Sequence, residues 1–91
     1  MKKSDLKRKL KQSQIPNQWY SLDGGRDHAT FCIGRSILWW EVYYSQPNGK
    51  TNRKFFLTET SACDYFYHWF TESLRIQGLL ATEQLKITQN I

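Results

Sequence analysis

The sequence predicts an α+β fold: a four-stranded antiparallel sheet flanked by an N-terminal helix and a C-terminal helix packed on the sheet, in two layers. A run of β-branched and aromatic residues, 37–45, is followed by Asn48-Gly49 and a second strand-like run, which is typical of a hairpin. Apolar residues at helical spacing follow Thr58, and a shorter helical pattern opens the chain. Ninety-one residues are expected to form a single domain, 1–91.

Residues 1–14 are predicted to form a basic N-terminal helix. Leu6 and Leu10 lie one turn apart, Ser4 is the expected N-cap, and Pro16 stops the helix. Because only Leu6, Leu10 and Ile15 are apolar, this helix is expected either to dock at the edge of the domain or to fray.

The antiparallel sheet is assigned to residues 17–57, with strands expected at 18–22, 29–34, 37–45 and 52–57. Asp23-Gly24-Gly25 is a turn signal between the first two strands. The third strand carries bulky side chains on both faces, which favours a central position. Its uncharged face is expected to be core and consists of Leu38, Trp40, Val42 and Tyr44.

A helix is predicted over 58–77, with Thr58 as its N-cap and an end near Gly78. Its expected buried stripe is Ala62, Cys63, Phe66, Phe70, Ser73 and Leu74, with Tyr67 and Trp69 beside it. Residues 79–91 are either a tail or a short helix.

The formal net charge of +5 comes from the N-terminal segment. Residues 1–14 hold six of the thirteen basic side chains and one of the eight acidic ones, so the rest of the chain is neutral. The first residues are basic without a following apolar run, so neither a secretory signal nor a membrane span is expected. Cys32 and Cys63 are expected to be buried thiols, as in a reducing compartment, and the alternative is a single disulfide between them. We expect a cytoplasmic protein.

The residues for enzymatic chemistry are sparse. His28 lies in a polar turn and His68 on the outer face of a helix, and no ligand cluster has metal-binding spacing. Gly24-Gly25 lacks the context of a phosphate-binding loop. We therefore expect no catalytic residue, metal, cofactor or small-molecule substrate.

The second aromatic face of the third strand requires further packing, a nucleic acid or a protein partner. Nucleic acid is disfavoured, because the RNA-recognition signature is absent and the sheet carries little charge beyond Arg53 and Lys54. A protein partner suits surplus Tyr, Trp and Arg. The candidate contacts are Trp39, Glu41, Tyr43, Arg53 and Lys54 on the outer sheet, Arg26, Asp27 and His28 in the turn, and Tyr65, His68 and Glu72 on the helix.

Residues 17–70 resemble a family of small bacterial immunity proteins, which are encoded beside polymorphic or contact-dependent growth inhibition toxins. The matching elements are Tyr20-Ser21-Leu22, Gly24, Gly25, Cys32, Trp40-Glu41-Val42-Tyr43-Tyr44, Gly49, Lys50, Ala62-Cys63 and Tyr65-Phe66-Tyr67.

The resemblance implies a non-enzymatic antidote that binds a cognate toxin C-terminal domain and occludes or locks its active site, protecting producer and sibling cells. Immunity proteins against nucleases are often acidic, whereas this chain is basic, which favours a neutral or acidic toxin domain. The alternative is a small nucleic-acid-binding or regulatory domain that uses the basic N-terminal segment and the sheet aromatics.

Overall fold

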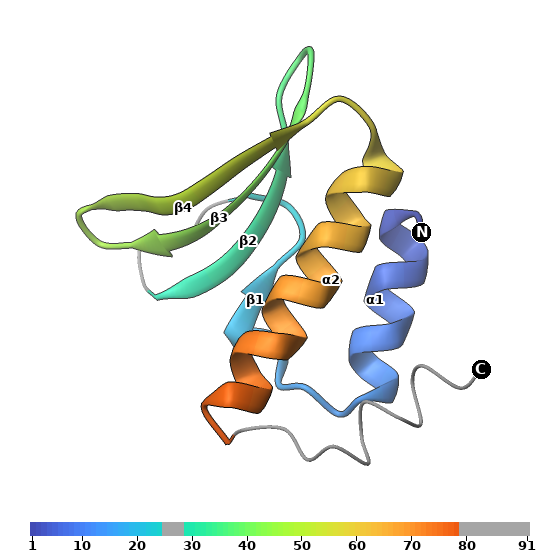
Figure 1. Cartoon of the computed structure of the whole chain (residues 1–91), viewed down its shortest axis with the longest axis vertical. Helices are drawn as coiled ribbons and strands as arrows, with labels where there is room; N and C mark the ends of the chain where they lie inside the picture. Colours follow the sequence, from blue (N-terminus) through green and yellow to red (C-terminus); the bar gives the residue numbers. More distant parts are fainter. Residues whose placement is uncertain (25–28, 79–91) are drawn as a thin grey trace.

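The computed structural model describes residues 1–24 and 29–78 (Figure 1). The elements in chain order are α1 (Lys3–Gln12), a 3-10 helix (Asn17–Trp19), β1 (Tyr20–Ser21), β2 (Thr30–Arg35), β3 (Trp40–Gln46), β4 (Gly49–Phe56) and α2 (Glu59–Ile76). The four strands form one sheet in the order β1-β2-β3-β4, and α1 and α2 lie side by side next to it (Figure 1). The α+β class is confirmed. The expected tail or short helix at 79–91 lies outside the described residues.

The sheet is mixed, so the prediction of a purely antiparallel sheet is wrong. β2, β3 and β4 are antiparallel to one another, but β1 pairs with β2 in parallel. The chain does not reverse into a hairpin at Asp23-Gly24. Instead the backbone N–H of Gly24 donates to the carbonyl of Ile33 at 3.1 Å, so the chain continues alongside β2 in the same direction. A Cβ added to Gly34 would lie 3.2 Å from the Cα of Gly24, so glycine lets the two backbones meet.

The β3–β4 hairpin turns at Pro47–Asn48, as the sequence predicts, but β4 begins at Gly49 and not at residue 52. The register shifts between Val42 and Tyr44: one residue of β3 there faces two residues of β4, Asn52 and Arg53. Asn52 has φ of 54°, a left-handed conformation that asparagine tolerates better than most residues. β4 therefore contains a β-bulge, which the sequence pattern did not predict.

The second helix follows its sequence pattern closely. The Thr58 side-chain oxygen accepts from the N–H of Ser61 at 3.2 Å, which confirms the N-cap. The helix ends at Ile76, close to Gly78 as expected. Its buried residues are Ala62, Cys63, Phe66, Tyr67, Phe70, Thr71 and Leu74. This face forms one core with Ile33 and Val42 of the sheet and with Leu6 and Leu10 of α1.

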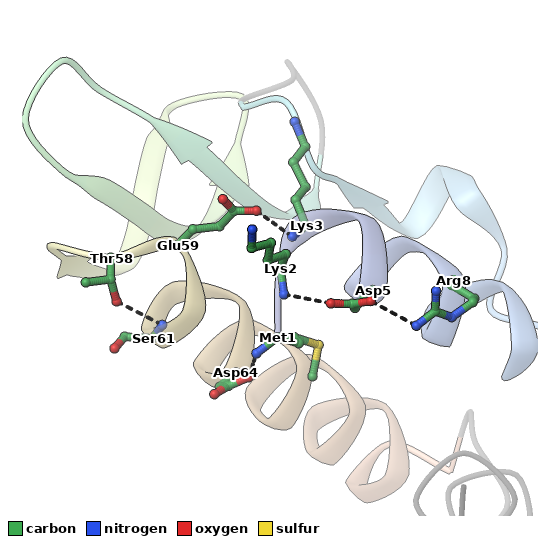
Figure 2. A network of polar contacts seen from close by, with 9 residues as sticks. All are labelled: Met1, Lys2, Lys3, Asp5, Arg8, Thr58, Glu59, Ser61 and Asp64. Atoms are coloured by element: carbon green, nitrogen blue, oxygen red, sulfur yellow. Dashed lines mark hydrogen bonds and ion pairs between the residues drawn. The ribbon is translucent and has the colours of Figure 1, made fainter.

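The start of α1 is fixed by acids of α2 (Figure 2). The Glu59 carboxylate accepts from the backbone N–H of Lys3 at 2.7 Å, and the Asp64 carboxylate pairs with the N-terminal ammonium of Met1 at 2.7 Å. Asp5 accepts from the N–H of Lys2 at 3.1 Å. The predicted N-cap at Ser4 is wrong, because the helix starts two residues earlier with Lys2 as its N-cap. Leu6 and Leu10 are fully buried, so α1 docks.

Both faces of the middle of the sheet are covered. Phe31 contacts Phe70 of α2 with ring centroids 4.8 Å apart, so alternate residues of β2 face α2. Cys32 and its register partner Tyr43 point to the opposite face, yet Cys32 is 0% and Tyr43 only 3% exposed. Gly24 lies beside the Tyr43 hydroxyl, and the Lys50 ammonium lies 4.4 Å from the centre of its ring. The prediction of Tyr43 as an exposed contact is therefore wrong.

Replacing Asn52 should show the cost of the β4 bulge. Asn52→Val is expected to lower the free energy of unfolding by about 1 kcal/mol, because a β-branched residue fits the left-handed conformation poorly. Asn52→Gly, which has no Cβ, should stay within about 0.5 kcal/mol of the parent. Urea denaturation measures both. Equal stability of the valine and glycine variants would argue against the left-handed conformation.

The buried Tyr43 phenol should make stability depend on alkaline pH. Burial, followed by the adjacent Cys32 thiol, raises the pKa of Tyr43 from 10.0 to about 12. The unfolded chain therefore loses this proton first, so stability should fall as pH rises from about 10 to 12. Tyr43→Phe should reduce this fall, measured by urea denaturation across that range. An unchanged pH profile in the variant would indicate that Tyr43 ionises equally in both states.

Candidate protein-binding surface

Large apolar side chains gather at one end of the sheet. Ile37 is 92% exposed, Leu38 73%, Trp39 40%, Phe55 54% and Leu57 85%. They come from the β2–β3 turn and from the end of β4, which meet near the top of Figure 1. We call these five residues the apolar end surface. Contiguous exposed apolar patches on a small domain commonly mark interaction sites.

A tight turn projects the first two of these side chains. The N–H of Ser36 donates to the carbonyl of Trp39 at 2.8 Å, which places Ile37 and Leu38 at the tip. The prediction of Leu38 as core is therefore wrong. The sequence placed this turn at 34–36 and began the strand at Ile37, whereas β3 begins at Trp40.

Aromatic side chains form the base of the apolar end surface. Trp39 and Phe55 meet edge to face, with ring centroids 6.2 Å apart. A shallow hollow of about 360 Å³ is lined by Trp39, Phe55, Phe56 and Leu57. Its walls are almost wholly apolar, and such a hollow can accept an apolar side chain of a partner.

A charged group borders the aromatic base. Glu41 accepts from Arg53 at 2.6 Å and from Lys50 at 3.1 Å. Burial of Glu41 opposes ionisation, but the hydrogen bonds from Arg53 and Lys50 outweigh it, so the pKa of this carboxyl lies below its ordinary value. The Arg53 guanidinium also lies 5.3 Å from the centre of the Phe55 ring. Glu41 thus holds Arg53 against the edge of the apolar end surface.

The β4 bulge makes this arrangement possible. Lys50 and Arg53 are three residues apart, so in a regular strand their side chains would point to opposite faces. The extra residue in β4 turns both toward the face that carries Glu41 and Tyr43. The bulge thereby concentrates two cations on the sheet face opposite α2.

The predicted contact residues are only partly brought together. Trp39 and Arg53 are exposed and adjacent to Phe55, and Glu41 is half-buried beneath Arg53. Lys54 is exposed but pairs in register with Val42, so it lies on the opposite face, the α2 side. Arg26, Asp27 and His28 lie outside the described residues.

The predicted helix contacts lie apart from this surface. Tyr65 is half-buried and stacks on Trp69 with ring centroids 6.1 Å apart, whereas Glu72 pairs with Arg75. His68 is exposed.

The sequence missed four members of the surface: Ile37, Leu38, Phe55 and Leu57. Ile37 and Leu38 lack the Gly, Asn or Pro that identifies most turns, so nothing local separates them from the strand that follows. Phe55 and Leu57 alternate as core residues would. A possible signal was the continuity of the run Ile37–Trp40, because a strand of alternating burial seldom begins with four large apolar residues.

The described residues offer little for a cofactor. Within residues 1–24 and 29–78, no group of three or more His, Cys, Asp or Glu side chains could hold a metal ion. The Cys63 thiol is buried in the core, and burial raises its pKa to about 11, so it remains protonated at neutral pH. No helix among the described residues combines the length and the apolar character that crossing a membrane requires.

Comparisons of the chain with protein-family models, with curated proteins and with solved structures found no match. A proposal of function therefore depends on the chain's own residues.

Proposed function

We propose that this protein binds another protein through the apolar end surface, and that its partner is a toxin domain of the kind its immunity-protein resemblance implies. The observation that supports this proposal is the set of five large apolar side chains, 40–92% exposed, at one end of the sheet. Water contact of such side chains is costly, and a protein partner removes it.

The size and composition of the surface suit a stable complex. Burying a fully exposed large apolar side chain contributes about 1.5–3 kcal/mol. Trp39 and Arg53 are residue types that often dominate binding energy. A standard interface covers about 800 Å² per partner, which is roughly a seventh of the 5835 Å² that this chain exposes. The apolar end surface with the adjoining part of β4 could fill such an area.

Inhibition would follow from binding alone. A preformed surface that covers the active site of the toxin, or locks an inactive conformation, needs no catalytic group of its own. The cations beside the aromatic base, Arg53 on one face of β4 and Lys54 on the other, favour a partner with an apolar centre and an acidic rim. The protein would act in the cytoplasm of the producing cell.

The alternative, a nucleic-acid-binding or regulatory domain, has weaker support. Of the two aromatic residues expected to stack bases on the outer sheet, Tyr43 is buried and Trp39 alone is exposed. The helix that carries the excess charge is docked, and Arg8 pairs with Asp5. Single-strand binders commonly use several exposed rings along a basic groove.

Substitutions in the apolar end surface should weaken toxin binding. Trp39→Ala and Leu57→Ser each remove apolar contact area, and a central contact typically costs about 2 kcal/mol, or roughly thirtyfold in Kd. Titration calorimetry with the toxin domain encoded beside this protein measures Kd, and survival of cells producing that toxin gives the second readout.

Ile76→Ser is the matched control. Ile76 is 71% exposed at the end of α2, outside the apolar end surface, so this variant should bind as the parent does. Thermal melting shows that each variant is folded. Unchanged Kd for folded Trp39→Ala and Leu57→Ser would place the toxin contacts elsewhere. No binding between the parent protein and the neighbouring toxin domain would refute the immunity function itself.

A further inference from the structure

A cleft beside α1 is left unused by the proposed function. The chain turns back at Pro16, and Lys3 at the start of α1 pairs with Asp23, so residues 17–23 run alongside α1 in the opposite direction. Between them lies an open cleft of about 610 Å³. Its walls include Lys3, Lys7 and Lys11 of α1 and Tyr20, Ser21 and Asp23 of the facing segment.

The helix wall is a ladder of cations. Lys3, Lys7 and Lys11 occupy successive turns of α1 on one side of the helix, with a rise of about 6 Å between neighbours. Asp23 is the single acid among the lining residues, and it pairs with Lys3. Lys7 and Lys11 are exposed, so the cleft has an excess of positive charge.

The opposite wall is a strand at the edge of the sheet. β1 is the outermost strand in the order β1-β2-β3-β4, and both of its residues line the cleft. On an edge strand, alternate backbone N–H and C=O groups point away from the neighbouring strand and are available to another extended chain. The cleft thus has the edge of a short, largely buried strand on one side, with Tyr20 6% and Ser21 7% exposed, and exposed lysines on the other.

We propose that this cleft binds an extended acidic peptide segment that runs beside β1 and places alternate carboxylates on Lys7 and Lys11. In an extended chain, every second side chain points the same way at a spacing of about 6.6 Å, close to the spacing of the lysines. Acidic side chains at every second position would therefore meet successive lysines in register.

The same features disfavour a nucleic acid. Among the lining residues Tyr20 is the single aromatic one, and it is only 6% exposed because its ring packs on Phe70 with centroids 5.7 Å apart. The cleft thus lacks an exposed ring on which a base could stack.

The test uses fluorescence anisotropy with two labelled peptides of equal composition. One has glutamate at every second position with threonine between. The other has its glutamates in adjacent pairs, so that none are two residues apart. The alternating peptide should bind more tightly to the parent protein, and Lys7→Gln combined with Lys11→Gln should weaken its binding about tenfold, as for two exposed ion pairs. Glutamine has nearly the helix propensity of lysine, so α1 should persist in the variant.

A control of equal charge separates the cleft from general attraction. Lys50→Gln with Lys54→Gln removes two exposed charges from β4, which lies three strands away from β1 and outside the cleft lining. This variant should leave the affinity within about twofold, because exposed charges beyond a Debye length are largely screened. Equal losses in the two double variants, equal affinity for the two peptides, or tighter binding of an oligothymidylate would each overturn the proposal. Trp39→Ala should bind the alternating peptide normally, so this inference can hold or fail independently of the proposed function.

Discussion

The buried face of α2 is the interaction on which the rest of the structure depends. Phe66 and Phe70 are fully buried, and Phe70 contacts both Phe31 of β2 and Tyr20 of β1. The same helix face forms one core with Leu6 and Leu10 of α1. A domain of 91 residues has only a small net free energy of unfolding. Because a single helix joins the sheet to the other helix, much of that stability depends on a few side chains.

The proposed binding surface follows from the limits of this helix. One helix covers the middle of a four-stranded sheet but not its outer strand, and every residue of β4 except Phe56 is exposed. Phe56 still contacts Tyr65 of α2, with ring centroids 5.2 Å apart. Phe55 and Leu57, on either side of it in the sequence, are 54% and 85% exposed. A bound partner would bury these two side chains together with Ile37 and Leu38 of the turn.

Local patterns predicted the parts of the fold that local interactions determine. The α2 stripe, its Thr58 cap and the Asn48-Gly49 hairpin all follow from residues within a few positions of one another. The prediction that Tyr43 is exposed was wrong because the groups beside it come from distant positions: Gly24, nineteen residues earlier, and Lys50, beyond the hairpin. Of the predicted contacts, Trp39 and Arg53 are on the surface. The prediction that Leu38 is core was wrong because its exposure depends on the exact position of a turn, and that turn lacks the Gly, Asn or Pro that would identify it.

The topology of the sheet separates the two candidate binding sites. The apolar end surface includes the end of β4, whereas the lysine cleft borders β1, and these strands are the two edges of the sheet. Three strand spacings of about 4.8 Å lie between them, roughly 14 Å. That distance exceeds the Debye length of about 8 Å at physiological salt, so charges bound at one site are largely screened from the other. One molecule of this protein could therefore bind a partner at β4 and an acidic segment beside β1 at the same time, and the two sites would be coupled only through the shared core.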